Sequence, residues 1–177
     1  MSLIPRQPVP RLQVPLIGGG QFDLSNEQPE HFTLLVFYRG HHCPICMSYL
    51  RSLKEVRSEF EARGVSVVAL SSDSAERAQA THEKIKLDGL RLGYGLALSQ
   101  AQEWGLFLSA GKGKTSIGIE EPAQFSEPAL FLVRPDGTLY FSTIQSMPFV
   151  RPDFAALLKT IDFVVEKDYP ARGELIL

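Results

Sequence analysis

The sequence has little of what would place a chain in a specialised class of protein. It contains only two cysteines among 177 residues, and its formal net charge is −2. No stretch reaches the roughly 18 consecutive apolar residues that suggest a membrane-spanning helix. A disulfide-stapled scaffold, a strongly basic nucleic-acid-binding surface and a transmembrane segment are therefore not expected.

The first ten residues contain three prolines and no apolar core, so they do not have the pattern of a secretory signal. We therefore expect a cytoplasmic protein, with neither nucleic acid nor a membrane as its partner. The hydrophobic fraction of 44% and the charged fraction of 21% are ordinary for a globular protein. A chain of this length buries about 70% of its unfolded surface without help from a metal or a disulfide. We predict a single domain over residues 1–177.

Hydrophobic patterning predicts alternating strands and helices. The expected elements are, in order, a hairpin over residues 11–24, a strand over 32–38, a helix over 44–63, a strand over 65–70, a helix opened by Asp73 with Glu76 in a capping box, a weak strand over 92–98 with a short helix through Trp104, strands over 129–134 and 138–145, and a helix over 153–167. In the last helix, Phe154, Leu157, Leu158, Ile161 and Val165 are expected to point inward. Residues 109–124 show no clear period and are expected to form a surface excursion or a long loop.

The order of these elements is a βαβ unit followed by a ββα unit. That order is typical of the thioredoxin arrangement, an α/β fold in which helices flank a central mixed sheet. The first strand and the first long helix meet at the segment that holds both cysteines. The sequence therefore predicts that the cysteines lie at a strand–helix junction.

Cys43 and Cys46 are separated only by Pro44 and Ile45. A disulfide between residues three apart closes a very small loop and adds little stability. In a reducing compartment, such a pair is typical of redox catalysis or metal binding. Because the pair follows a predicted strand and begins a predicted helix, it has the setting of a redox CxxC motif.

Pro44 suits the first position of the helix, which would make Cys43 the N-cap residue. The unpaired amides and the positive end of the helix dipole favour a thiolate at that position. Cys46 lies one turn later on the apolar face of the helix and should be more buried. We therefore expect Cys43 to attack and Cys46 to resolve the mixed disulfide.

Polar residues that precede the pair add to this expectation. A protonated His42 or the charge of Arg39 would stabilise a thiolate, and a neutral His42 would instead shuttle a proton. His41 is expected to be a solvated residue at the strand end. A metal site built from His41, His42, Cys43 and Cys46 is the alternative, since imidazole and thiolate bind zinc or copper(I). No second CxxC or HxxxH pattern completes such a site, so redox chemistry is favoured.

Residues 37–46, F-Y-R-G-H-H-C-P-I-C, resemble the F-Y-R-G-x-x-C-P-x-C signature of the peroxiredoxin-like branch of the AhpC/TSA family. The resemblance extends over most of the chain from about residue 11, through residues 104–106, 129–133, 135–137, 147–152 and 168–174. It implies a thioredoxin-like fold with an N-terminal hairpin and an insertion before a cis-proline strand. It also implies thiol chemistry without an organic cofactor or a metal.

Two alignments follow from the resemblance, and they differ on the nucleophile. Against the family motif P-x-x-x-T-x-x-C, Cys46 takes the position that attacks peroxide and Cys43 replaces the threonine. The family's catalytic arginine then falls on Pro128, so Arg39 or Arg151 would have to replace it. Against thioredoxin, Cys43 attacks, and Pro128 is the cis-proline that would hold the backbone of the preceding residue open for an extended substrate. Both assignments stay open, and the position of Cys43 at the helix start favours it for disulfide exchange.

The resemblance implies a thiol-based antioxidant oxidoreductase that reduces peroxides or disulfides through a cysteine sulfenate or a mixed disulfide. A Cys43–Cys46 disulfide would result, and an external thiol reductant of the thioredoxin or glutathione type would reduce it. The alternatives are a thioredoxin-like disulfide exchanger without peroxidase activity, the metal-binding module and a redox-inactive scaffold. A homodimer is plausible, and residues 109–127 are expected to cover the site or to join an interface.

Overall fold

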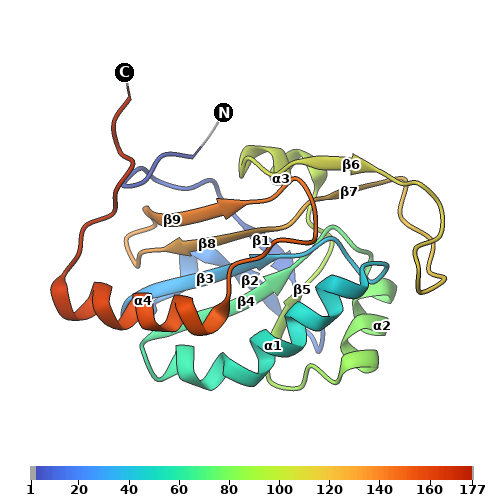
Figure 1. Cartoon of the computed structure of the whole chain (residues 1–177), viewed down its shortest axis with the longest axis horizontal. Coiled ribbons are helices and arrows are strands. Elements are labelled where there is room, and N and C mark those ends of the chain that lie inside the picture. Colours follow the sequence, from blue (N-terminus) through green and yellow to red (C-terminus); the bar gives the residue numbers. More distant parts are fainter. Residues whose placement is uncertain (1–2, 177) are drawn as a thin grey trace.

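The computed structural model describes residues 3–176 and has a five-stranded mixed sheet at its centre (Figure 1). The strand order is β5-β4-β3-β8-β9, and two small two-stranded sheets, β1–β2 and β6–β7, accompany it. The strands are β1 Gln13–Pro15, β2 Gln21–Asp23, β3 Phe32–Phe37, β4 Val65–Leu70, β5 Arg91–Gly93, β6 Leu108–Ala110, β7 Gln124–Ser126, β8 Ala129–Val133 and β9 Leu139–Ile144. The helices are α1 Pro44–Glu61, α2 Ala75–Ile85, α3 Leu98–Glu103, α4 Phe154–Lys167 and the 3-10 helix Leu24–Asn26.

The central strand β3 is buried along its whole length, as its continuous apolar run predicts. It pairs in parallel with β4 and antiparallel with β8, so the sheet joins a parallel half to an antiparallel half. This confirms the thioredoxin-like α/β fold. The arrangement brings the end of β3 to the start of α1, where the cysteines lie.

Alternate residues of β3 face two different hydrophobic clusters, because successive side chains of a strand point to opposite faces. Leu34 and Val36 pack beneath α1 and α4, which lie on the same face of the sheet (Figure 1). Leu35 and Phe37 pack on the other face with Trp104, which follows α3. The expected N-terminal hairpin, β1–β2, covers that second face and is confirmed.

Residues 109–124 form a paired excursion from the fold, and not a long loop. β6 and β7 pair antiparallel, and an isolated bridge between Lys114 and Glu120 continues the pairing (Figure 1). We call residues 108–126 the β6–β7 hairpin. Each of its strands has three residues, which is too short for an alternating pattern to stand out among the glycines.

Other local predictions are wrong in detail. Ser74, not Asp73, caps α2 by accepting a hydrogen bond from the N–H of Arg77 at 3.4 Å. The weak strand is limited to β5, and the chain leaves the sheet before α3. In α4, Val164 is buried and Val165 is 39% exposed, because one helical position turns a side chain by about 100°. The inward positions of Phe154, Leu157, Leu158 and Ile161 are confirmed.

Among residues 3–176, no helix is both long enough and apolar enough to cross a lipid bilayer.

Candidate active site

The start of α1 sets the position of both sulfur atoms. Cys43 is the N-cap residue and has an extended backbone conformation. Pro44 is the first residue of the helix. The backbone N–H of Cys46 donates to the sulfur of Cys43 over 3.3 Å, which satisfies one of the free amides of the helix end. The predicted N-cap position of Cys43 is confirmed.

The loop between β3 and α1 is fitted closely against Asp73. Gly40 has a φ of +139°, and a Cβ at this position would lie 2.6 Å from the Oδ1 atom of Asp73. The Asp73 carboxylate also accepts the backbone N–H of His41 at 2.6 Å. Only glycine meets both requirements, so this residue fixes the path of the chain into the cysteine segment.

The two thiols have opposite electrostatic environments. Hydrogen bonds from the Cys46 thiol and from the Cys46 backbone N–H lower the pKa of Cys43 to about 6, with further help from the charges of Arg39 and Arg151. Burial raises the pKa of Cys46 well above its ordinary value, as does its bond to Cys43. The surroundings of the two sulfurs therefore favour a thiolate at Cys43 over one at Cys46.

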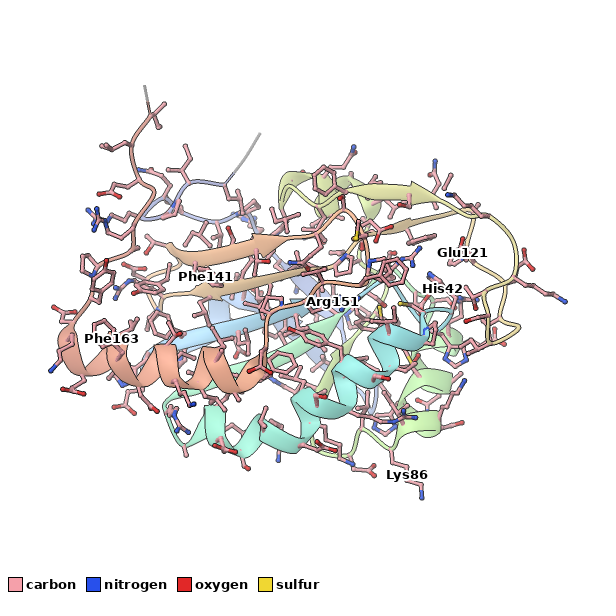
Figure 2. All side chains as sticks on the ribbon, in the orientation of Figure 1. His42, Lys86, Glu121, Phe141, Arg151 and Phe163 are labelled. Atoms are coloured by element: carbon pink, nitrogen blue, oxygen red, sulfur yellow. The ribbon has the colours of Figure 1, made fainter. Side chains whose placement is uncertain are left out.

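Arg151 reaches the second cysteine directly. Its Nη2 atom lies 3.0 Å from the sulfur of Cys46, and its Nε atom donates to the carbonyl oxygen of Pro148 at 3.1 Å. The guanidinium also lies 5.0 Å above the ring of Tyr49. The Tyr49 hydroxyl in turn donates to the carbonyl of Pro152 at 2.7 Å, so α1 holds the segment that carries Arg151 (Figure 2).

Arg39 is held away from the sulfurs by the β6–β7 hairpin and the residue that follows it. Its guanidinium lies 3.4 Å from a carboxylate oxygen of Glu121 and 3.4 Å from one of Glu127. It also lies 4.6 Å above the ring of Phe125. Arg39 therefore acts on Cys43 only through space, and its direct contacts anchor the hairpin.

His42 is fully buried and cannot be the imidazolium that would stabilise a thiolate. Its ring lies 4.6 Å from that of Phe125, and its Nδ1 atom is 3.3 Å from a guanidinium nitrogen of Arg77. Burial and the charges of Arg39 and Arg77 lower its pKa to about 4. Of the two states that the sequence left open for His42, the neutral one is favoured at neutral pH, because two arginines face a buried histidine.

Pro128 does not form the predicted cis bond, since every peptide bond described in residues 3–176 is trans. The N–H of Glu127 donates to the carbonyl of Phe107 at 2.7 Å, and the carbonyl of Pro128 accepts from Gln145 at 2.9 Å. The hydrogen bond from Glu127 extends the pairing of the β6–β7 hairpin. The N–H of Glu127 is thus occupied by this chain rather than held open for an extended substrate.

The described residues also give no support to the metal-binding alternative. No group of three or more histidine, cysteine, aspartate or glutamate side chains in that part of the chain could hold a metal ion. The Nδ1 atom of His41 lies 3.0 Å from the hydroxyl of Thr81, and that of His42 faces Arg77. The imidazoles are turned to the protein rather than gathered around the thiols.

A family model described as the AhpC/TSA family matches residues 5–142. The chain belongs to this family. It is therefore a peroxiredoxin-like antioxidant oxidoreductase, a thiol-dependent peroxidase by family. No curated protein sequence matches it significantly.

Solved structures agree with this AhpC/TSA assignment at the level of the fold. A cysteine-to-serine mutant of the peroxiredoxin 6 of Arenicola marina has a TM-score of 0.75 and 18% identity, and the match covers 94% of this chain and 76% of that one. Mycobacterium tuberculosis AhpC has a TM-score of 0.74 and 14% identity, with 95% and 96% covered. The peroxidoxin BcpB of the same bacterium has a TM-score of 0.69 and 17% identity, with 92% and 98% covered.

The sequence did not point to several residues that shape this AhpC/TSA site. Asp73 was expected only as a helix-start residue and Arg77 was not singled out, yet Asp73 is buried and Arg77 contacts both it and His42. Glu121 and Phe125 lie in or beside the segment expected to be a loop. The one available signal was the position of Asp73 shortly after β4, at the carboxyl end of a parallel strand beside the cysteine loop.

A large apolar groove lies elsewhere on this AhpC/TSA chain. It has a volume of about 560 Å³ and runs between β9 and α4, where Phe141 and Phe163 line it (Figure 2). Neither cysteine lines this groove. The thiols are instead 1% exposed or less, beneath their surrounding loops.

Proposed function

We propose that this AhpC/TSA chain reduces peroxides with Cys43 as the first nucleophile and Cys46 as the resolving cysteine. The observation that carries this assignment is the sulfur of Cys43 at the N-cap of α1, where it accepts a hydrogen bond from the N–H of Cys46. The thiolate, not the thiol, attacks peroxide. Cys43 has the lowered pKa, and Cys46 does not.

In the first step, the Cys43 thiolate attacks one oxygen of the peroxide and the O–O bond breaks. The other oxygen leaves as an alkoxide or hydroxide and takes up a proton, and Cys43 becomes a sulfenic acid. In the second step, the Cys46 thiolate attacks the sulfenic sulfur, hydroxide leaves as water after protonation, and a disulfide forms. A thiol reductant then returns the disulfide to two thiols.

Arg151 has its proposed role in the second step. Once Cys43 is oxidised, Cys46 must lose its proton although burial opposes its charge. The guanidinium of Arg151 lies 3.0 Å from that sulfur and favours the anion. The contact belongs to Cys46 and not to Cys43, which supports a role in resolution rather than in the first attack.

An external thiol system of the thioredoxin or glutathione type is the proposed reductant. The solved structure of a yeast mitochondrial 1-Cys peroxiredoxin, with a TM-score of 0.72 and 15% identity, is described as resolving its thiol through glutathione and thioredoxin systems. Two free cysteines that are needed as thiols suit a reducing compartment, for which we propose the cytoplasm.

A homodimer is also proposed, with β9 as part of its contact surface. β9 is an outer strand of the sheet, and the N-terminal segment pairs with residues 137–139 at the start of this strand. Phe141 in the same strand is 40% exposed. Light scattering after size-exclusion chromatography should give twice the chain mass, and Phe141→Glu should reduce it to the mass of one chain.

A thioredoxin-like exchanger is the second candidate, because an N-cap thiolate also attacks disulfides. Stopped-flow oxidation by hydrogen peroxide separates the two when wild type is compared with Cys43→Ser and Cys46→Ser. We expect the fast phase to vanish in Cys43→Ser, and Cys46→Ser to accumulate a sulfenic acid that dimedone traps. A fast phase that survives Cys43→Ser and vanishes in Cys46→Ser would reverse the two roles. Oxidation no faster than that of a free thiol, with rapid reduction of a model disulfide, would favour the exchanger.

A further inference from the structure

A chain of three side chains, Asp73, Arg77 and His42, runs beside the cysteine segment. Asp73 is buried, and its Oδ1 atom lies 3.0 Å from the Nε atom of Arg77. A second guanidinium nitrogen of Arg77 lies 3.3 Å from the Nδ1 atom of His42. The residues come from two different places in the fold, since Asp73 and Arg77 lie at the start of α2 and His42 directly precedes Cys43.

This geometry decides which nitrogen of His42 carries its proton. A guanidinium can only donate hydrogen bonds, so the Nδ1 atom that faces it must accept. A neutral imidazole that accepts at Nδ1 carries its hydrogen on Nε2. The alternative tautomer would place an N–H against the N–H groups of Arg77.

The charged groups around the ring act in the same direction. Arg39 beyond the end of β3, Arg77 in α2 and the neighbouring His41 all oppose a positive charge on His42, and Glu121 of the β6–β7 hairpin alone favours it. The result is a pKa of about 4, so the imidazole is neutral across the ordinary pH range. The imidazole is therefore not a cation. It is also not available as a base, because its Nδ1 atom accepts from Arg77.

The other nitrogen of the ring is an unpartnered donor. Nε2 of His42 is buried and has no hydrogen-bond partner, although buried polar atoms almost always have one. Leaving an N–H without a partner in the interior costs free energy. The residue directly before the attacking cysteine thus keeps a donor ready for a group that the resting protein does not supply.

We propose that Asp73 and Arg77 are positioning residues that lock His42 as the Nε2–H tautomer, so that it donates a hydrogen bond to the oxygen anion that develops when peroxide reacts. Arg77 acts on the imidazole, and Asp73 acts on Arg77 by fixing the plane of its guanidinium. A donor that is already oriented and already dehydrated stabilises a developing oxyanion without reorganisation in the reaction step.

The tautomer is measured directly by long-range 15N–1H NMR correlations of protein with 15N-labelled histidine. The reduced wild type should show the Nε2–H form of His42 at pH 7. Arg77→Met should give the Nδ1–H form or a mixture, and Arg77→Lys should retain more of the wild-type pattern. A wild-type Nδ1–H form, or a pattern unchanged in Arg77→Met, would overturn the proposal. Asp73→Asn provides a second route if Arg77→Met does not fold.

Because the role of the donor rests on the proposed peroxidase reaction, the rate of oxidation is measured separately. A glutamine side chain can place an N–H near the position of the imidazole Nε2, whereas asparagine places it near Nδ1. We expect His42→Gln to lose less than fivefold of the rate of peroxide oxidation and His42→Asn to lose tenfold or more. His82→Gln is the control, at a half-buried histidine of α2 that faces Asp88. Equal rates for the two variants would overturn the donor role. A slow wild type with the expected tautomer would instead refute the peroxidase reaction alone.

Discussion

The sequence offers two arginines, Arg39 and Arg151, as replacements for the family's catalytic arginine. The structure places them in contrasting surroundings. Arg151 lies against the sulfur of Cys46, and its Nη1 atom is buried without a partner. Arg39 is held between Glu121 and Glu127 and stacks on Phe125. The same type of side chain thus contacts a thiol in one region and anchors the β6–β7 hairpin in the other. The distance of an arginine from a cysteine along the sequence does not decide which of these surroundings it has, because the carboxylates that pair with it come from distant segments.

The largest expected effect is on stability, from Arg39→Met. Glu127 is 4% exposed, and the substitution leaves its carboxylate buried without a cation. Removing one member of a buried ion pair costs about 3 kcal/mol or more. The free energy of unfolding in urea should fall by that amount.

Two matched variants sharpen that measurement. Glu127→Gln in the Arg39→Met background should restore much of the loss, because no buried charge then remains. Arg57→Met breaks an ion pair with Glu61 on the surface of α1 and should cost less than about 1 kcal/mol. The comparison between the two arginines fails if Arg39→Met proves as mild as Arg57→Met.

The next effect is on the rate of disulfide formation, from Arg151→Met. Losing the guanidinium beside Cys46 should raise the pKa of this thiol further and slow its attack on the sulfenic acid. A rise of one pKa unit lowers the thiolate fraction tenfold, so we expect a loss of about tenfold or more. Acid-quenched samples analysed by mass spectrometry follow the step.

Arg51→Met is the control for that variant, since Arg51 is an exposed arginine on the same helix as the cysteines. Arg151→Lys should retain part of the rate, because an ammonium keeps the charge without the planar fork. Sulfenic acid formation at Cys43 should be slowed less than disulfide formation. If Arg151→Met instead slows the first step more than the second, Arg151 serves the attack on peroxide.

The smallest effect is expected from Glu121→Gln. Glutamine keeps an acceptor for the backbone N–H of Lys112, which bonds to Glu121 at 2.8 Å, but removes one negative charge from Arg39. More of the positive charge of Arg39 then acts on Cys43, so its pKa should fall slightly. Below pH 6, peroxide oxidation should accelerate by about twofold, since a small pKa decrease raises the thiolate fraction there. A slower reaction would show that the ion pair itself positions the site.

The main features of the fold and the N-cap position of Cys43 could be predicted because they depend on local sequence. Each of these features is indicated by a short stretch of sequence: β3 by its apolar run, the N-cap by Pro44 after Cys43, and α1 by its 3.6-residue spacing. The β6–β7 hairpin and the role of Asp73 could not be predicted in this way. Both depend on contacts between distant segments, such as Asp73 with the loop at Gly40, for which one sequence has no pattern.

The states of Pro128 and His42, which the sequence did not settle correctly, have the same physical origin. Pro128 was expected in a cis bond by analogy, but its surroundings include a hairpin that occupies the neighbouring N–H. His42 was open to either a protonated or a neutral form, and burial and two arginines favour the neutral one. In each case the state of the residue is set by partners that fold against it from distant parts of the chain.

The central claim is that Cys43, and not Cys46, is the thiolate of the reduced protein. The most direct test follows the alkylation of each cysteine by iodoacetamide from pH 4 to pH 10, with both sites quantified by mass spectrometry. The pKa of Cys43 is lowered, so its rate should rise tenfold per unit below pH 6 and level off above a midpoint near 6. Cys46 should react slowly throughout. A midpoint for Cys43 near the ordinary value of about 8.5, or faster alkylation of Cys46 at neutral pH, would contradict the assignment.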